Sequence, residues 1–462
     1  MLCACVSGPD YEAPPAVAAV AEAERFANEN EPEADEDAVP ASGPWWAEIG
    51  GTELAALIGE LNTQNLDLAA ARARVEQAGA VARQARARRL PAVRASGDGG
   101  GLRLLDPPGF PWADTYSAAI SASWDTDIFG RLRNADRAAR LRADAALLSQ
   151  NALRQSLAAE IARAYVGAFA LMRQIEIAEG LSESFSETAM LSDERYRAGS
   201  QTVSALDVQI SRQNAAAAAA SIPNLEAQYV VRLQTIDILL GRLPGTTTLS
   251  FAEMAEAGAL PAASVGEPSG VLRNRPDVAF AEASFRAALS DIGVARADLY
   301  PTITLSGVLQ QASSPANVLG AETLIANLVG EVVAPLYEGG RRRAEVRRAE
   351  AAARELGAEF EQTALTAVGD VEAALAQEQA SADTVALRAV SLEAARLSDA
   401  IASERYAAGR VGLLTVLETR RALDAARQDL VAADEARLNA RIDLRLALGG
   451  DWFDDSERQA SP

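Results

Sequence analysis

Hydrophobic positions in this chain follow two different periods, which predict two kinds of structure. Between Arg131 and Ala198 apolar residues recur every three or four positions and no proline interrupts them, a spacing typical of an amphipathic helix. This stripe contains Leu157, Ile161, Tyr165, Phe169 and Met172. At 1.5 Å per residue, a continuous helix over this range is roughly 100 Å long. Gly199 then ends the pattern, since glycine is favoured just after a helix.

Residues 91–126 have the period of a β-strand instead. Here Tyr116, Ala118, Ile120, Ala122 and Trp124 alternate with Ser117, Ala119, Ser121, Ser123 and Asp125. An alternation of this kind predicts a strand with one apolar and one polar face. The glycine-containing segment 91–105 supplies a partner strand. A second strand pair is expected at about 301–336, where Ile303, Leu305, Gly307 and Leu309 alternate with mainly polar neighbours.

The second strand pair belongs to a duplication of the whole pattern. Leu90-Pro91-Ala92-Val93 returns as Tyr300-Pro301-Thr302-Ile303, and the segment 194–199 returns as 404–409, both with a shift of 210 residues. Solenoid repeats have units of about 20–50 residues, so this chain is better described as one structural unit fused to itself. Further helices are expected at about 45–89, 204–240, 275–299, 341–408 and 413–448, and prolines stop two of them at 91 and 301.

The composition of the chain disfavours several classes of function. The 462 residues have a net charge of −21, which disfavours nucleic-acid binding. Histidine is absent, and with it the commonest general base and metal ligand. No nucleophile motif takes its place, so we expect no enzyme, no metal site and no cofactor. No segment approaches the roughly 18–20 apolar residues of a transmembrane helix, so a membrane crossing would have to use strands.

Both cysteines lie at the N-terminus, in Met1-Leu2-Cys3-Ala4-Cys5. One interpretation is a pair of free thiols on a cytosolic tail. We favour the end of a bacterial lipoprotein signal, Leu-x-Ala-Cys, with Cys5 as the acylated first residue and the true start upstream of Met1 or trimmed. A covalent lipid there anchors the chain to a membrane at roughly 0.8 kcal/mol per buried CH₂. Residues 12–44, rich in Glu, Asp, Ala and Pro, are expected to form an extended linker.

Four strands per chain leave open edges, which limits what they can build. Small closed barrels need about eight strands, so a barrel would have to be shared among several chains. The alternation fits such a barrel, with apolar side chains toward lipid and Ser or Thr toward water. An antiparallel sheet covering a soluble helical bundle fits the periodicity equally well, so the pattern alone leaves both structures open.

Short motifs along the chain favour the shared barrel. They are Cys5-Val6-Ser7-Gly8-Pro9-Asp10-Tyr11, Trp45-Trp46, Asn65-Leu66-Asp67-Leu68, Trp124-Asp125-Thr126-Asp127-Ile128-Phe129-Gly130-Arg131, Asn274-Arg275-Pro276-Asp277, Tyr300-Pro301-Thr302-Ile303, Pro335-Leu336-Tyr337-Glu338-Gly339-Gly340-Arg341 and Arg405-Tyr406-Ala407-Ala408-Gly409. In this order, and duplicated, they resemble the TolC family of outer-membrane efflux ducts. The resemblance is closer to the NodT-like lipoprotein branch of that family.

The resemblance implies a fold that is mainly α with a small β part, with duplicated long helical hairpins plus two β-hairpins per chain. Three chains would form a homotrimer, a trimeric α-barrel continued by a 12-strand transmembrane β-barrel. The expected regions are a lipidated N-terminal segment and linker (1–44), a first repeat (45–272), a second repeat (273–450) and a C-terminal tail (451–462). The expected location is the bacterial outer membrane, in contact with its lipid and with a large periplasmic extension.

The function that the resemblance implies is passive export. The duct would be the outer-membrane channel of a tripartite efflux system and would pass drugs or other small molecules. A periplasmic adaptor protein would connect it to an inner-membrane pump, of the resistance-nodulation-division type. The alternatives are the outer-membrane duct of a type I protein secretion system and a periplasmic coiled-coil scaffold, which would be soluble without detergent and form no pore.

The resemblance also nominates residues for a periplasmic gate. Glu418 and Thr415 match the acidic positions that close similar ducts, but the threonine departs from the acid, so a double ring of charge is in doubt. Three Glu418 carboxylates near one axis would repel one another and attract cations. The alternative is an exposed helix residue paired with Arg421 one turn on. Tyr406 matches a tyrosine that ties the inner hairpin to its neighbour, with ordinary helix packing as the alternative.

Other candidates lie at the two ends of the predicted duct. Gly199 and Gly409 would allow a positive φ at the hairpin turns, and in the family these turns meet the adaptor. The docking candidates are Gly199, Gly409, Val411, Gly412 and Leu413. Trp112, Tyr116 and Trp124 are candidates for anchors at the membrane interface, with a subunit contact as the alternative.

Overall fold

The computed structural model describes residues 8–28, 45–102, 112–199, 203–254, 260, 265, 267–313 and 323–450. Cys5 and the predicted C-terminal tail lie outside the described residues. The chain forms two compact units, and each combines segments from both halves of the sequence. The first comprises Met1–Ala18, Ala71–Ser149 and Asp277–Thr363, and the second comprises Ala19–Ala70, Gln150–Pro276 and Ala364–Pro462. The division into four regions that the sequence suggested stays a prediction.

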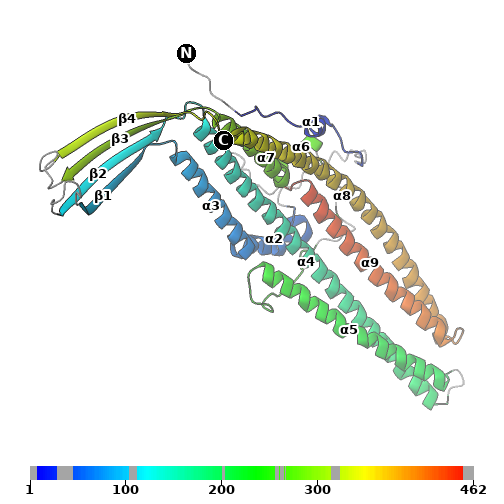
Figure 1. Ribbon diagram of the computed structural model, residues 1–462. Helices are drawn as coiled ribbons and strands as arrows, with labels where there is room; N and C mark the ends of the chain where they lie inside the picture. The colour runs from blue at the N-terminus through cyan, green and yellow to red at the C-terminus, as the bar shows by residue number, and fades with distance from the viewer. Residues whose placement is uncertain are drawn as a thin grey trace. The chain divides into compact units, whose positions relative to one another are not determined.

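Each half of the sequence contributes one helix of 67 residues followed by one of 35. These are α4 (Arg131–Arg197) and α5 (Ala205–Leu239) in the first half, and α8 (Arg341–Ala407) and α9 (Leu413–Ala447) in the second (Figure 1). The shorter helices are α2 (Ala47–Gln64), α3 (Leu66–Ala87), α6 (Pro268–Asn274) and α7 (Pro276–Ala297). Equal lengths in corresponding positions are what a duplication predicts.

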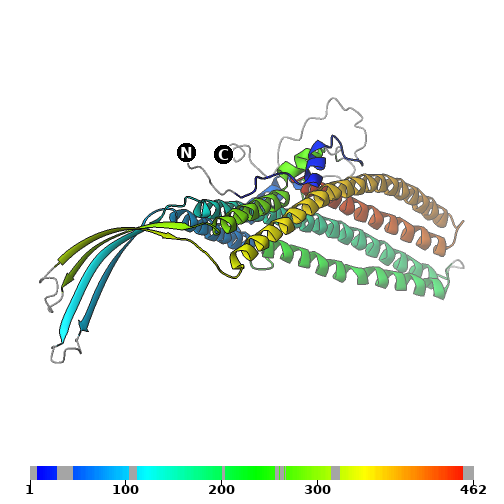
Figure 2. The same cartoon turned by 45° about the horizontal axis from the view of Figure 1, so that its top comes forward.

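The strands form one antiparallel sheet in the order β1-β2-β3-β4 (Figure 2). Their bounds are Ala92–Leu102 for β1, Ala113–Asp125 for β2, Thr302–Ser313 for β3 and Thr323–Val333 for β4. The two predicted strand pairs are joined where β2 meets β3, with Ile120 opposite Leu309 and Trp124 opposite Leu305. In the single chain β1 and β4 are therefore edge strands, with unpaired backbone groups along their outer sides.

The predicted helix at 45–89 is two helices, and Asn65 separates them. Its side-chain oxygen accepts the N–H of Leu68 at 2.9 Å, which caps α3. Its side-chain nitrogen donates to the carbonyl of Leu239 at 2.7 Å. Asn65 is 4% exposed, so both bonds are sheltered from water. The single-helix prediction was wrong because periodicity does not show that this asparagine is fixed by a distant carbonyl.

The core of the second unit is built around Tyr165 of α4, which is fully buried. Its hydroxyl donates to the Glu53 carboxylate at 2.7 Å, and that carboxylate also accepts the N–H of Phe251 at 2.9 Å. The Phe251 ring lies 5.0 Å from the Tyr165 ring. Apolar residues around this group include Ile49, Leu61, Ile161, Ile236, Leu438 and Ile442. The segments near 45–64 and 249–254 are thereby packed onto α4, α5 and α9.

The first unit is packed through small side chains. Ala288, Ile292 and Ala295 of α7 lie against Ala349 and Ala353 of α8, and short side chains allow two helices to approach closely. No helix in the described part of the chain has the length and the apolar run that a membrane crossing requires.

One element was missed by the sequence analysis. Helix α1 (Pro15–Glu22) lies inside the range predicted to be an extended linker. Val17 and Val20 are buried, and Phe26 further on is also buried. The linker prediction was wrong for this segment because composition does not show that these apolar side chains find a surface to cover. Burial of that kind, rather than intrinsic propensity, stabilises a helix this short.

Candidate functional site

The two tip glycines each follow a long helix. Gly199 and Gly409 have φ values of +76° and +68°, in the left-handed region that favours glycine. At Gly409 the N–H donates to the Tyr406 carbonyl at 2.9 Å, and the N–H of Arg410 donates to the Arg405 carbonyl at 2.8 Å, which is a Schellman cap. A Cβ on either glycine would meet no atom within 4 Å. Glycine is therefore needed here for backbone conformation and not for close packing.

The residues after the Gly409 turn differ in exposure. Gly412 is exposed and Val411 is half-buried. Leu413, the first residue of α9, is 7% exposed and packs with Phe185 and Leu417. Of the docking candidates, Gly199, Gly409 and Gly412 are therefore at the surface, whereas Leu413 contributes to the chain's own core.

Tyr406 lies between the two long hairpins. Its ring packs against the cluster that contains Phe185 of α4 and Leu417 of α9. The guanidinium carbon of Arg195, also on α4, lies 5.5 Å from the centre of the ring, within the range of a cation–π interaction. Within one chain, this tyrosine thus connects the end of α8 to α4.

Thr415 and Glu418 lie one turn apart on the exposed side of α9. Among the described residues, no hydrogen bond or ion pair is formed by the Glu418 carboxylate. Arg421, its expected ion-pair partner, donates to the side-chain oxygen of Asn214 on α5. Arg420 donates to the hydroxyl of Thr188 on α4 at 3.3 Å. Arg420 and Arg421 therefore both contact the other hairpin, and neither pairs with Glu418, which faces solvent.

The register of the sheet sorts its residues into two faces that differ in charge. Between Tyr116 and Trp124, one face consists of Tyr116, Ala118, Ile120, Ala122 and Trp124 with the residues paired to them, Val93, Ala95, Gly97, Gly99, Leu305, Gly307, Leu309, Gln311, Leu324, Ala326, Leu328 and Gly330. None of these residues is an Asp, Glu, Lys or Arg, so this face carries no charged side chain. The opposite face contains Arg94, Asp98, Asp125 and Glu331 among mainly polar residues, with Val308, Ile325 and Val329 as apolar members on β3 and β4.

The uncharged face is exposed in the single chain. Tyr116 is 62% exposed and Leu328 is 82% exposed. Trp112, just before β2, is also exposed. Trp124 is partly covered, and its ring N–H donates to the carbonyl of Arg89 at 2.9 Å. An apolar surface of this kind needs a partner, either another protein surface or lipid.

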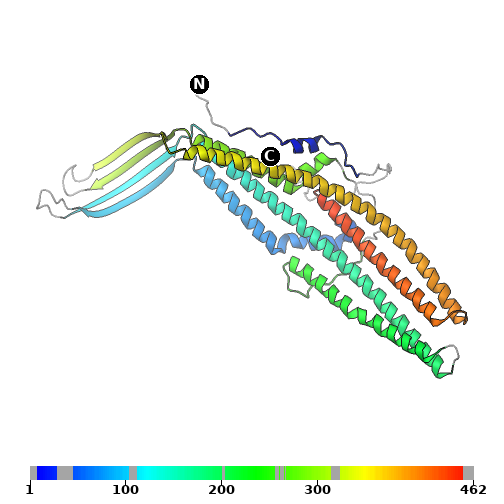
Figure 3. The ribbon, with the colours of Figure 1, turned by 45° about the vertical axis from the view of Figure 1, so that its right-hand side comes forward.

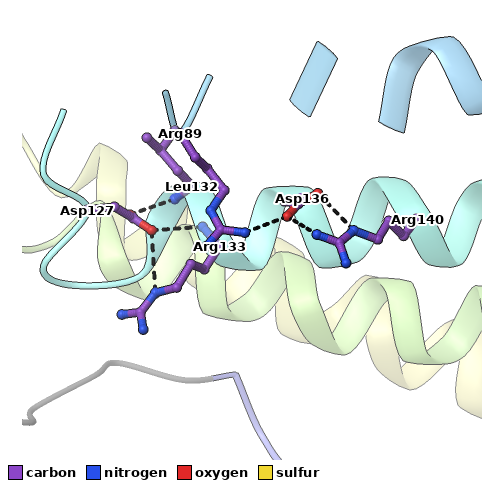
Figure 4. A network of polar contacts seen from close by, with 6 residues as sticks. All are labelled: Arg89, Asp127, Leu132, Arg133, Asp136 and Arg140. Atoms are coloured by element: carbon purple, nitrogen blue, oxygen red, sulfur yellow. Dashed lines mark hydrogen bonds and ion pairs between the residues drawn. The ribbon is translucent and has the colours of Figure 1, made fainter. Parts of the chain in front are cut away.

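Where β2 leads into α4, a network of carboxylates and guanidinium groups fixes the start of the helix (Figure 4). Asp127 has a φ of +46°, and its carboxylate accepts the N–H groups of Leu132 at 2.8 Å and Arg133 at 2.9 Å. These are donors that the first turn of a helix leaves unpaired, and a negative charge there is favourable. Asp127 therefore caps α4 from outside the helix.

Asp136 is the buried centre of the same network. It is 1% exposed and accepts hydrogen bonds from Arg89 at 2.7 Å and from Nε of Arg140 at 3.0 Å (Figure 4). Burial favours the neutral acid, but the hydrogen bonds from Arg140 and Arg89 outweigh it and lower the pKa of Asp136 below its usual value. The carboxylate therefore stays charged and ties the turn after α3 to α4.

Sequence reasoning used the segment 124–131 only as a mark of resemblance and missed the roles of Asp127, Asp136 and Arg89. The available signal was an acidic residue four positions before Arg131, where the helix was predicted to start. No signal pointed to the burial of Asp136, since Arg140 lies on α4 itself but Arg89 comes from the turn after α3. In the described part of the chain, no group of three or more Cys, Asp or Glu side chains is arranged to hold a metal ion.

The chain is similar to known proteins over nearly its whole length. The family model described as "Outer membrane efflux protein" matches residues 57–242 and 268–450. The pyoverdine export outer membrane protein OpmQ of Pseudomonas putida is 34% identical over 426 residues, 89% of either chain. Nodulation protein T of Rhizobium leguminosarum bv. trifolii is 28% identical over 466 residues, 98% of this chain and 96% of that one. The solved structure of the outer-membrane channel OprN has a TM-score of 0.86 and 27% identity, and covers 97% of this chain and 100% of its own.

These findings confirm the resemblance to TolC-family and NodT-like proteins. They also confirm the predicted fold class of the chain, mainly α with a small β part, built from duplicated long helical hairpins and two β-hairpins. The chain therefore belongs to the outer membrane efflux protein family, whose members are channels of the bacterial outer membrane and not enzymes.

Proposed function

We propose that three copies of this chain form the passive exit duct of a tripartite efflux system. The observation that carries the proposal is the sheet, which has one uncharged, exposed face and an unpaired edge strand on each side. Pairing β4 of one copy with β1 of the next would satisfy both edges and close a barrel of twelve strands. The uncharged face would then contact lipid, and the face with Arg94, Asp98, Asp125 and Glu331 would line water.

The spacing of aromatic residues supports a membrane position for the sheet. Tyr116 and Trp124 lie on the uncharged face, eight residues apart on β2. At about 3.3 Å per residue they are separated by roughly 26 Å along the strand. A barrel strand tilted by about 40° would reduce this to about 20 Å along the membrane normal, which fits within the apolar band of about 25 Å in outer-membrane barrels. This spacing supports both as interface anchors, and Trp112 would extend the outer aromatic group.

The cargo that we propose is small molecules, including drugs, rather than secreted proteins. Support comes from OpmQ, the relative at 34% identity, whose name gives pyoverdine export as its activity. Delivery would come from an inner-membrane pump of the resistance-nodulation-division type through a periplasmic adaptor. The adaptor would contact the exposed tip glycines, Gly199, Gly409 and Gly412. A diacylglyceryl lipid on Cys5 would anchor each copy in addition to the barrel.

The gate of this duct would be formed by α9. Glu418 is exposed and makes no ion pair among the described residues, so its charge is available to a central opening. Three such carboxylates around an axis would repel one another and attract cations. Thr415, one turn earlier, would add hydroxyl groups and no charge, and Tyr406 would hold the hairpin in its closed position.

The decisive experiment is the molar mass of the full chain in detergent, after expression behind a working lipoprotein signal and extraction from the outer membrane. Light scattering should give three times the chain mass of 48.5 kDa, adjusted for the lost signal and the added lipid. Trimers reconstituted in planar bilayers should then conduct ions. A monomer or dimer that is soluble without detergent would refute the duct and favour a periplasmic scaffold.

A further inference from the structure

Five exposed arginines beside the sheet have no acidic partner within the described part of the chain. Arg83 and Arg86 lie near the end of α3, and Arg88 lies in the turn that follows this helix. Arg343 and Arg347 lie one turn apart at the start of α8. Among the described residues, none of these guanidinium groups forms a hydrogen bond or an ion pair. Both outer strands of the sheet, β1 and β4, therefore adjoin helix ends that carry uncompensated positive charge.

The carboxylates of the neighbouring segments do not neutralise these arginines. Residues 77–97, which run from α3 into β1, contain no Asp or Glu. The carboxylates between residues 338 and 350 are all paired with other arginines. These pairs are Glu338 with Arg341 and Arg342, Glu345 with Arg348, and Glu350 with Arg296. An anion that balances the five arginines would therefore come from outside the chain.

The stability of the two helices explains only part of this arrangement. A helix has a partial negative charge at its C-terminus, which favours the arginines at the end of α3. Its N-terminus has a partial positive charge, which disfavours Arg343 in the first turn of α8. Arg342 in the same turn is compensated by Glu338, whereas Arg343 is not. The position of Arg343 is therefore unfavourable in the single chain, and an external anion would relieve this cost.

Closing the barrel would bring the two groups of arginines together. Residues 88–91 connect α3 to β1, and residues 334–340 connect β4 to α8 (Figure 3). In the proposed duct β4 of one copy pairs with β1 of the next, so the start of α8 would lie beside the end of α3 of that next copy. We call this contact between two copies, with the five arginines described above, the basic seam. Positive charges side by side repel one another, so the basic seam favours a bound anion.

Two observations favour a lipid over a soluble anion. Trp124, on the uncharged face of the sheet, donates its ring N–H to the carbonyl of Arg89 at 2.9 Å, so the turn after α3 lies beside a candidate for a membrane-interface anchor. Leu336 and Tyr337, in the connection from β4 to α8, are 96% and 90% exposed. Exposed apolar side chains beside guanidinium groups suit a molecule that has both acyl chains and a phosphate. A guanidinium group binds a phosphate through two parallel hydrogen bonds.

We propose that each basic seam binds the headgroup of an anionic phospholipid, and that the lipid holds neighbouring copies together where the barrel meets the helices. The inference rests on the trimer of the proposed function, because each site needs arginines from two copies. The phosphate would lie between α8 of one copy and α3 of the next, and the acyl chains would lie along the uncharged face of the sheet. Each arginine near an anionic headgroup should strengthen binding about fivefold.

Lipid binding to the full-length trimer in a neutral detergent tests this proposal. The probe is phosphatidylglycerol, and native mass spectrometry counts the lipids that stay bound. Phosphatidylglycerol should bind more tightly than phosphatidylcholine, whose headgroup has no net charge, and its binding should weaken at about 0.5 M NaCl because salt screens exposed charges. Equal binding of the two lipids, or binding that does not depend on salt, would overturn the proposal. Displacement of the lipid by inorganic phosphate would show a site for free anions and would also overturn it.

Two double variants connect the binding to the basic seam. Arg343→Gln/Arg347→Gln removes the charges on the α8 side, and Arg86→Gln/Arg88→Gln removes charges on the α3 side. Each should weaken phosphatidylglycerol binding about 30-fold, since two factors of about fivefold are lost. All four side chains are exposed, so the fold should be retained. Unchanged lipid affinity in either double variant would overturn the proposal.

A matched control removes the same charge elsewhere. Arg388 and Arg396 are exposed residues of α8 in the second unit, and Arg388 lies about 60 Å along the helix from Arg347. Arg388→Gln/Arg396→Gln should leave the lipid affinity unchanged, and a loss equal to that of the seam variants would overturn the proposal. The competing explanation is that the seam arginines pair with carboxylates of the neighbouring copy. The seam variants would then weaken the trimer in lipid-free detergent and leave the lipid affinity unchanged.

The outcome is separable from that of the proposed function. A trimer that conducts ions and shows no preference for phosphatidylglycerol would refute the lipid site alone. A chain that forms no trimer would refute both, and light scattering identifies this result before any lipid is added. A trimer that binds the lipid at the basic seam and does not conduct would refute the duct and leave the lipid site supported.

Discussion

Asp136 offers the sharpest test of how the strands are joined to the helices. We consider Asp136→Asn, which keeps the size of the side chain and removes its charge. The carboxylate is 1% exposed and accepts hydrogen bonds from Arg89 and Arg140. The variant retains one acceptor oxygen but leaves two guanidinium groups without their counter-charge, so the first turns of α4 should open more often.

The size of the effect follows from the exposure of the partners. Removing one member of a fully buried ion pair costs about 3–5 kcal/mol. Here the arginine side chains are 38% and 55% exposed, so water can hydrate them after the substitution. We therefore expect about 2–3 kcal/mol, the upper part of the range of about 1.5–3 kcal/mol for hydrogen bonds to charged groups. Since each 1.4 kcal/mol is a factor of ten, amide exchange in α4 should accelerate roughly 30- to 150-fold.

Hydrogen exchange with mass spectrometry over residues 131–145 measures this directly. Because the pKa of Asp136 is lowered in the folded protein, its stabilising contribution is complete above the unfolded value of about 3.9. The contribution is lost as the pH falls through the lower folded pKa. The difference between parent and variant should therefore be full at pH 7 and shrink below about pH 4.

The matched control is Asp291→Asn, since Asp291 pairs with Arg142 and both side chains are exposed. Such a pair contributes less than about 1 kcal/mol, so exchange should change by less than about fivefold. Equal exchange in the parent and Asp136→Asn at pH 7 would refute the reasoning. So would a difference that persists unchanged after Asp136 is protonated.

Three further predictions concern α9 and its turn. Gly409→Val places a side chain at positive φ, at a cost of about 1–2 kcal/mol. It should abolish efflux while light scattering still shows a trimer, and retained efflux would contradict docking at the tip. Glu418→Gln should change single-channel conductance and divalent-cation block, and identical currents would exclude it from the gate. Asp424→Asn should raise the unfolding midpoint at pH 7, because burial raises the pKa of Asp424 and one of its oxygens has no partner among the described residues. The gain should shrink as the pH falls below the raised folded pKa and vanish below the unfolded value of about 3.9, where the acid becomes neutral in both states. Asp429→Asn, in an exposed pair, is the control, and a lower midpoint for Asp424→Asn would refute the argument.

Helices and strands were predictable wherever one local rule decided them. The stops before Pro91 and Pro301 follow from the chemistry of proline, and the ends at Gly199 and Gly409 follow from glycine's access to positive φ. The alternation of apolar and polar residues around Ile120 predicted β2 and its apolar face. The pairing of β2 with β3 was not predictable, because it joins residues nearly 190 positions apart and no local pattern records such a contact.

The candidate site was predictable as a set of positions and not as a set of contacts. The sequence placed Tyr406 and Glu418 near a turn, but their surroundings depend on which side chains the opposite hairpin presents. Arg421 could be expected beside Glu418 by spacing alone, yet it binds Asn214 from α5. The same limit explains why Asp136 was missed. Its partner Arg140 is four residues away, but its second partner, Arg89, comes from the distant turn after α3.

The contacts of α9 change in strength along its length, which bears on how the tip can move. Near the tip, the Arg420 guanidinium of α9 lies 3.8 Å from the Asp399 carboxylate of α8, and both side chains are partly exposed. Further along, Arg441 is 1% exposed and pairs with Glu378 at 2.7 Å, and Arg445 pairs with Glu48 at 2.9 Å. Exposed pairs contribute about 0–1 kcal/mol, whereas breaking a buried one costs several. Local opening should therefore begin at the tip and stop before Arg441, so that the buried arginines act as the fixed end about which the tip moves.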